Sequence, residues 1–171
     1  MKYNNVILID SSYTSFYRFF ATKTWYSMAN KEEFKEIEDF KNYDWLNNKV
    51  FIEKYEKMYL ESIKKLVSAK VFNNSMIVFA RDPPQATIWR KEEACNYKDG
   101  RQDLTEKHNF KPIFKHTYQN LIPSWTEKND NMFELKQENI EADDIIALLC
   151  KYIKNNYKDK SIYIVSGDED F

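Results

Sequence analysis

Three short, mainly apolar runs constrain the fold more than any other feature of this chain. They occupy residues 6–9, 75–79 and 162–165, and a weaker fourth run covers residues 133–135. Their length and their content of β-branched side chains are typical of strands buried on both faces of a parallel sheet. The chain is therefore predicted to build its core around such a sheet.

Helical patterns separate these runs. Ser11-Ser12 supplies an N-cap for a helix that ends near residue 27. Two longer apolar stripes predict helices over residues 45–70 and 141–155. The stripes consist of Phe51, Tyr55, Met58, Ile63, Leu66 and Val67, and of Ile145, Leu148, Leu149, Tyr152 and Ile153. Strands that alternate with helices predict an α/β fold with right-handed crossovers, a central parallel twisted sheet and helices on both faces.

Two other stretches are less regular. Residues 30–44 are charged and aromatic, which indicates a surface excursion with a short helix, and residues 88–122 combine helical stretches with weak periodicity. No internal repeat or linker interrupts the 171 residues, so one domain over residues 1–171 is expected.

Composition narrows the class of protein. The formal net charge is −1, so overall charge gives no support to nucleic-acid binding, and any such case must come from how charges are placed. Two cysteines, Cys95 and Cys150, form no disulfide framework, and the first residues lack the apolar run of a signal peptide. No stretch of about 20 apolar residues is present, so we expect an intracellular protein without a membrane span.

Acidic residues follow three of the predicted strands. Asp10 comes directly after the first, Asp82 lies three residues past Phe79, and Asp168 and Asp170 follow the last. The carboxyl ends of parallel strands share one edge of a sheet, where ligands bind. A further acidic group, Glu141, Asp143 and Asp144, opens the helix predicted at residues 141–155. If the sheet order brings these segments together, seven carboxylates converge.

Such a cluster needs cations, because close like charges raise each other's pKa. Hard oxygen ligands select Mg²⁺ or Mn²⁺, and two such ions about 4 Å apart can activate a water and stabilise the leaving oxygen of a phosphodiester. Each group alone has a structural explanation. Asp10 can be a helix-entry residue, and the helix dipole favours the acids at 141–144, in the first turn of a helix. Asp82-Pro83 and Gly167-Asp168 are sequences common in turns. Their joint placement at one sheet edge favours a metal site.

Several segments, in order, resemble the 5′ nuclease superfamily. This superfamily comprises flap endonucleases, phage 5′ exonucleases and the 5′-3′ exonuclease domain of bacterial DNA polymerase I. The matching segments are residues 8–13 with Tyr17-Arg18, Asp82 with residues 87–90 and 97–101, residues 141–144, and residues 165–171. The resemblance covers essentially the whole chain. It implies a PIN-like, resolvase-like domain with a helical arch.

The resemblance also implies roles for individual residues. Asp10, Asp82, Glu141 and Asp143 are similar to ligands of a first metal ion, Asp168 and Asp170 to ligands toward a second, and Asp144 to an acid beside the site. On the arch, Lys98 and Arg101 resemble the catalytic basic pair that reaches the scissile phosphate. Arg90 and Tyr97 resemble nucleic-acid contacts at and near the arch entrance. His108 and His116 have no counterpart and are expected at the surface.

The implied activity is that of a metal-dependent, structure-specific 5′ nuclease that cuts phosphodiesters near DNA 5′ ends in replication or repair. Its expected cofactor is Mg²⁺ or Mn²⁺, one or two ions, and its expected partner is DNA with a flapped, nicked or RNA-primed 5′ end, or RNA. Two departures stand out: Ile140 replaces a usual glycine, and no helix-hairpin-helix region follows Phe171. A partner or a missing C-terminal region would then complete the duplex-binding site. The alternatives are a non-catalytic nucleic-acid-binding module and a PIN-like ribonuclease.

Overall fold

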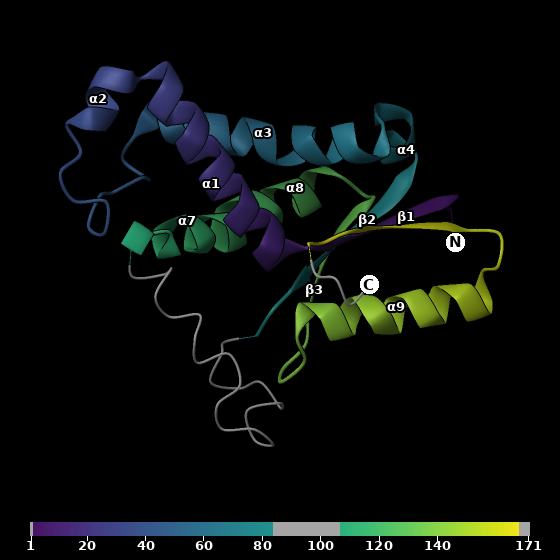
Figure 1. Ribbon diagram of the computed structural model, residues 1–171. Coiled ribbons are helices and arrows are strands. Elements are labelled where there is room, and N and C mark those ends of the chain that lie inside the picture. Colours follow the sequence, from purple (N-terminus) through teal and green to yellow (C-terminus); the bar gives the residue numbers. More distant parts are fainter. Residues whose placement is uncertain (1, 84–106, 168–171) are drawn as a thin grey trace.

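A four-stranded parallel sheet forms the centre of the computed structural model, which describes residues 2–83 and 107–167 (Figure 1). Its strands are β1 (Asn5–Asp10), β2 (Ser75–Arg81), β3 (Met132–Lys136) and β4 (Ser161–Val165). All three strand pairs are parallel, in the order β3-β2-β1-β4. The predicted α/β fold is confirmed, and the weak run at 133–135 is a strand.

The strand order reverses at β1. The chain adds β2 and then β3 on one side of β1, and it returns to place β4 on the other side, with Ile9 opposite Val165. In open parallel sheets, ligands bind in the crevice outside the carboxyl ends of the strands where the order reverses. The fold therefore directs attention to the ends of β1 and β4.

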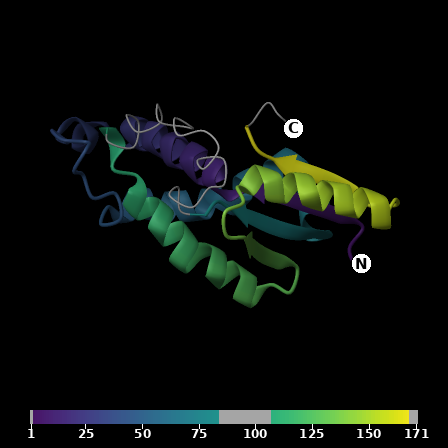
Figure 2. The ribbon, with the colours of Figure 1, turned by 90° about the horizontal axis from the view of Figure 1, so that it is seen from below.

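Helices cover both faces of the sheet, as predicted (Figures 1 and 2). Of the described helices, α9 lies on one face, and α1, α3 and the segment from α7 to α8 cover the other. The bounds are α1 Ser11–Ala29, α2 Lys31–Lys35, α3 Lys49–Val67, α4 Ala69–Asn73, α7 Lys111–His116, the π-helical turn η3 Thr117–Leu121, α8 Ile122–Lys128 and α9 Ala142–Asn156. The predicted helical arch lies outside the described residues. Within the described part, no helix is long and apolar enough to cross a membrane.

The sheet separates two cores of different composition. Alternate residues of β1 point to opposite faces. Ile7 and Ile9 join a core rich in rings, here named the aromatic core, whereas Val6 and Leu8 join an aliphatic core beneath α9. In the aromatic core, Phe19 of α1 packs edge-on against Trp45 with ring centroids 5.8 Å apart. Such edge-to-face contacts stabilise beyond the burial of apolar area.

The helix predicted over residues 45–70 is shorter in the structure. Asn48 caps α3, accepting a hydrogen bond from the Phe51 backbone N–H at 3.0 Å. Ser68 ends the helix with φ of 75°, a left-handed conformation that a regular α-helix cannot continue through. Of the predicted stripe, Leu66 is exposed, while Tyr59, outside that stripe, is fully buried.

The buried face of α9 also differs from the predicted stripe. Leu148 and Tyr152 are 59% and 56% exposed, and Ile146, which was not part of the stripe, is fully buried. The helix carries apolar pairs at 145–146, 148–149 and 152–153, so two overlapping stripes can be drawn along it. Packing against the sheet selects the stripe that contains Ala142, Ile146 and Ile153.

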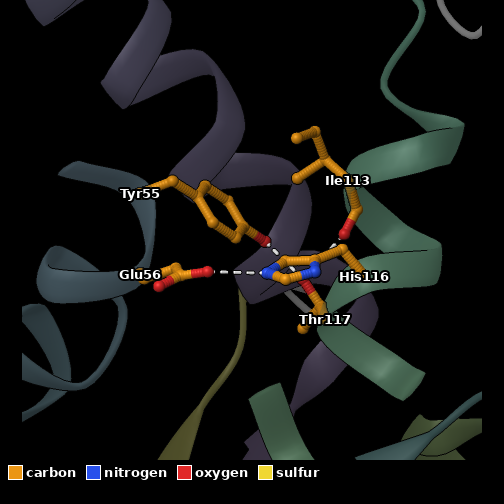
Figure 3. Close-up of polar contacts among 5 residues, drawn as sticks. All are labelled: Tyr55, Glu56, Ile113, His116 and Thr117. Atoms are coloured by element: carbon orange, nitrogen blue, oxygen red, sulfur yellow. Dashed lines mark hydrogen bonds and ion pairs between the residues drawn. The ribbon is translucent and has the colours of Figure 1, made fainter. Parts of the chain in front are cut away.

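The helix from α7 to α8 is fixed to α3 by buried polar contacts (Figure 3). The Tyr55 hydroxyl lies 2.8 Å from Thr117 Oγ1, which donates in turn to the Ile113 carbonyl. Beside them, His116 Nε2 lies 2.7 Å from Glu56 Oε1. Both histidines expected at the surface are half-buried. His116 joins α7 to α3, and His108 Nδ1 lies 3.1 Å from Lys23 Nζ of α1.

Candidate metal centre at the carboxyl edge of the sheet

Asp10 occupies the end of β1 and the start of α1. As the N-cap of α1, its Oδ1 accepts a hydrogen bond from the Tyr13 backbone N–H at 2.9 Å. The pKa of Asp10 is raised to about 6, mainly by burial and also by the charges of Asp82 and Asp143, against the lowering effect of the backbone hydrogen bonds from Tyr13 and Ser12. Both acids therefore lie within electrostatic reach of Asp10, as the strand topology predicts.

Asp82 joins the end of β2 to the start of α9. Its Oδ1 accepts a hydrogen bond from the Ala142 backbone N–H at 2.7 Å, so a carboxylate distant in sequence satisfies one of the free N–H groups at the helix start. The positive end of the helix dipole stabilises that negative charge. This bond holds the acidic residues of α9 beside the end of β2.

Three acids gather at the first turn of α9. Glu141 is only 1% exposed, and one carboxylate oxygen each of Glu141, Asp143 and Asp144 lie within 4.8 Å of one another. Asp143 Oδ1 also accepts a hydrogen bond from the Asp144 backbone N–H at 2.7 Å. Like charges at this spacing repel, and burial of Glu141 adds a desolvation cost. A divalent cation would offset both, so the donor set fits a hard metal ion.

The structure thus brings five predicted site residues to one edge of the sheet. This acidic cluster consists of Asp10, Asp82, Glu141, Asp143 and Asp144. The role of these residues as metal ligands stays a prediction. The remaining predicted site residues lie outside the described part of the chain: Asp168, Asp170, Arg90, Tyr97, Lys98 and Arg101.

The exit of β4 also borders the acidic cluster. Ser166 Oγ approaches Asp10 Oδ2 at 3.5 Å, a long hydrogen bond. The chain leading to Asp168 therefore leaves the sheet next to Asp10, at the reversal of strand order.

A second polar group at this edge was missed by sequence reasoning. Arg81 lies on the opposite face of β2 from Asp82, where it pairs with Glu134 at 3.1 Å and stacks on the Tyr118 ring at 4.2 Å. The Tyr118 hydroxyl lies 2.8 Å from Ser12 Oγ. Burial raises the pKa of Tyr118, as do the charges of Asp82 and Asp10. The one signal in the sequence for this polar group is that Arg81 directly precedes Asp82, a predicted site residue.

Tyr118 lies in the π-helical turn η3. Such turns are rare and frequently occur at functional sites. The turn interrupts the α-helical spacing between α7 and α8, and from it the Tyr118 side chain reaches Ser12 in the first turn of α1. The hydroxyl remains a neutral hydrogen-bonding group near the acidic cluster, because its raised pKa keeps it protonated.

A large hollow elsewhere is a weaker candidate. It measures about 750 Å³ and lies between α2 and the start of α3, with Glu33, Asp39 and Asp44 in its lining. The three carboxylates accept hydrogen bonds from nearby groups: Glu33 from the Tyr26 hydroxyl, and Asp39 and Asp44 within their own turns. These acids stabilise local structure and do not lie at the strand ends, so the hollow is not the better site.

The family model described as the 5′-3′ exonuclease, N-terminal resolvase-like domain, matches residues 5–171. A search of curated proteins finds no match.

Proposed function

This chain belongs to the family of 5′-3′ exonuclease N-terminal resolvase-like domains, and on that premise we propose that it is a metal-dependent, structure-specific 5′ nuclease. Family membership bears out the resemblance to the 5′ nuclease superfamily and the PIN-like fold, and it implies a nuclease role on nucleic acid. The finer proposal is hydrolysis of phosphodiesters near DNA 5′ ends, in replication or repair. The observation that carries it is the acidic cluster at the reversal of strand order.

The acidic cluster supports Mg²⁺ or Mn²⁺ as the cofactor. Glu141, Asp143 and Asp144 offer carboxylate oxygens within 4.8 Å of one another, and Asp10 and Asp82 lie beside them. Following the family resemblance, we propose that Asp10, Asp82, Glu141 and Asp143 hold the first ion, with Asp144 beside them. Such an ion, when bound, lowers the pKa of a water and neutralises charge on the phosphodiester. Glu141 keeps one carboxylate away from bulk water, and Asp82 fixes α9 at the edge through the Ala142 N–H.

Residues outside the described part complete the proposal. Asp168 and Asp170 are proposed as ligands toward a second ion, because they follow the exit of β4 beside Asp10. Lys98 and Arg101 are proposed to stabilise charge on the scissile phosphate. Arg90 and Tyr97 are proposed to grip a single strand, by charge and by stacking on a base.

Cleavage of labelled substrates tests the proposal. We would incubate wild type, Asp82→Asn and Glu141→Gln with 5′-flap, nicked and single-stranded DNA, and with the matching RNA, in Mg²⁺, in Mn²⁺ and in EDTA. Wild type should cleave DNA only with a divalent ion. The cleavage rate of each variant should fall about 100-fold or more, because replacing a metal ligand should reduce activity at least as much as replacing a residue that supports a ligand.

Asp159→Asn is the matched control, since Asp159 is an exposed acid beyond α9 that pairs with the neighbouring Lys160. It should cleave like wild type. Cleavage by Asp82→Asn at the wild-type rate, or undiminished cleavage in EDTA, would refute the metal-dependent mechanism. Preference for RNA would instead favour a PIN-like ribonuclease.

A further inference from the structure

Gly167, just past β4, lies against the phenol end of Tyr13, a side chain that is 40% exposed. Its φ is not in the left-handed region, so the backbone there is open to any residue. A Cβ at this position would instead overlap the phenol end of Tyr13, at the atoms Cζ, Cε2 and Oη. The Tyr13 ring therefore occupies the space that a side chain of residue 167 would need.

The location of this contact is specific. Tyr13 lies in the first turn of α1, and long helical side chains lean toward the N-terminus of their helix. From this position its ring reaches across to the exit of β4, which pairs with β1 at Ile9 and Val165. The ring thus bridges β1 and β4 at the reversal of strand order, beside Asp10.

Tyr13 contacts one oxygen of Asp10 directly and packs beside the segment that contacts the other. Its backbone N–H donates to Oδ1 at 2.9 Å. Its ring covers Gly167, whose neighbour Ser166 approaches Oδ2 at 3.5 Å. On the outer side, the Tyr17 ring stacks near the Tyr13 ring, with centroids 6.3 Å apart and planes 20° apart. Movement of the Tyr13 ring would therefore release the side of the Asp10 carboxylate that faces β4.

We propose that Tyr13 is a positioning residue of the acidic cluster: its ring, closed over Gly167, holds the exit of β4 against β1 and so fixes the Asp10 carboxylate for a divalent cation. The contact between ring and glycine stands on the geometry alone. The consequence for the cation rests on the proposed function. Groups that orient metal ligands in this way typically change metal affinity by 10–100-fold when removed.

A double-mutant cycle on the full chain tests this role. The variants are Tyr13→Ala, Gly167→Ala, their double mutant and Tyr13→Phe, with Tyr152→Ala as a control, since Tyr152 is an exposed tyrosine of α9. Two readouts need no nucleic acid: the Tm in EDTA, and the Mn²⁺ dissociation constant from electron paramagnetic resonance. Gly167→Ala should lower the Tm by about 2–4 °C when Tyr13 is present. In the Tyr13→Ala background, which lacks the ring, the same substitution should lower the Tm by less than half of that.

Mn²⁺ binding should weaken about tenfold in Tyr13→Ala and in Gly167→Ala, and the double mutant should be no weaker than the weaker single variant. Tyr13→Phe keeps the ring and should rescue binding, and Tyr152→Ala should bind like wild type. If Gly167→Ala lowers the Tm equally with and without the Tyr13 ring, the contact between ring and glycine is refuted. If Tyr13→Ala binds Mn²⁺ with wild-type affinity, the positioning role is refuted.

The outcomes separate this inference from the proposed function. If wild type binds Mn²⁺ but cleaves nothing, the nuclease proposal fails. The positioning role is then decided by the Mn²⁺ dissociation constants of the variants. If wild type binds no Mn²⁺, the metal-dependent function and the positioning role both fall, and the Tm cycle still decides the contact.

Discussion

At the scale of single residues, Asp10 joins two features that conflict near neutral pH. Its carboxylate caps α1, but it is largely buried beside other acids, and its pKa is raised from 3.8 to about 6. The folded metal-free protein therefore holds the Asp10 proton more tightly than the unfolded chain does. Stability from this proton is fully present below about pH 4 and is lost as the pH rises through about 6.

Asp10→Asn should reverse this loss in EDTA. Asparagine caps helices as well as aspartate and carries no charge. Urea denaturation should show equal free energies of unfolding for wild type and variant below about pH 4, and a variant more stable by about 1–3 kcal/mol above about pH 7. Asp159→Asn should show no such gain, because Lys160 lowers the pKa of the Asp159 carboxyl. A variant no more stable than wild type at high pH would contradict the assigned pKa.

Residues of the site differ in how far sequence could predict them. Asp10 and Asp82 could be placed at the edge because each follows an apolar run, and strand ends of a parallel sheet coincide. The contact of Gly167 could not be predicted, because its partner Tyr13 is far away in sequence. Tyr118 was missed for the same reason: its hydrogen bond to Ser12 is a tertiary contact.

At the scale of elements, the bond between Ser12 and Tyr118 connects α1 to η3. Tyr118→Phe keeps the ring beneath Arg81 and removes the hydroxyl. It should lower the free energy of unfolding by about 0.5–1.5 kcal/mol in urea, and the same substitution should cost much less in a Ser12→Ala background. An equal cost in both backgrounds would show that the hydroxyl has another partner.

The face that α9 presents to the sheet can be tested with a matched pair. Ile146→Ala removes a fully buried side chain and should cost about 2–5 kcal/mol, whereas Leu148→Ala, on the exposed side, should cost about 0.5 kcal/mol or less. Chemical denaturation measures both. A larger cost for Leu148→Ala than for Ile146→Ala would instead favour the buried stripe predicted from sequence, which contains Leu148.

Elements were predictable to different degrees for physical reasons. The central strands β1 and β2 were predictable because buried parallel strands are apolar runs, whereas the edge strands β3 and β4 are more exposed than their apolar residues indicated. The facing of α9 was ambiguous because its apolar pairs fit two stripes. The end of α3 depends on the positive φ of Ser68, and a serine in the sequence does not predict such a conformation.

For the molecule as a whole, a cation bound at the acidic cluster should stabilise the folded state. Mg²⁺ at about 100 times its dissociation constant should stabilise the folded state by about 2.7 kcal/mol, which corresponds to a Tm rise of about 5–10 °C. Far-UV circular dichroism would follow the melt, with potassium chloride at equal ionic strength as the control. Glu141→Gln should lose most of the rise, and an equal rise in that variant would place the cation elsewhere.

The overall architecture followed from alternation of strands and helices, but the strand order did not. Parallel strands, right-handed crossovers and helices on both faces were predictable from general rules. The reversal between β1 and β4 depends on which side of β1 the last strand occupies. That choice places Asp10 and the exit of β4 together, and the apolar runs alone do not encode it.

The unequal division of aromatic residues by the sheet has a spectroscopic consequence. Trp25, Trp45 and Trp125 all pack in or against the aromatic core, and the described members of the aliphatic core beneath α9 include no tryptophan. Emission from these indoles therefore senses one layer of the molecule. Detachment of α9, together with its acidic first turn, would leave that signal largely unchanged, and amide hydrogen exchange along residues 142–156 is the probe that would register it.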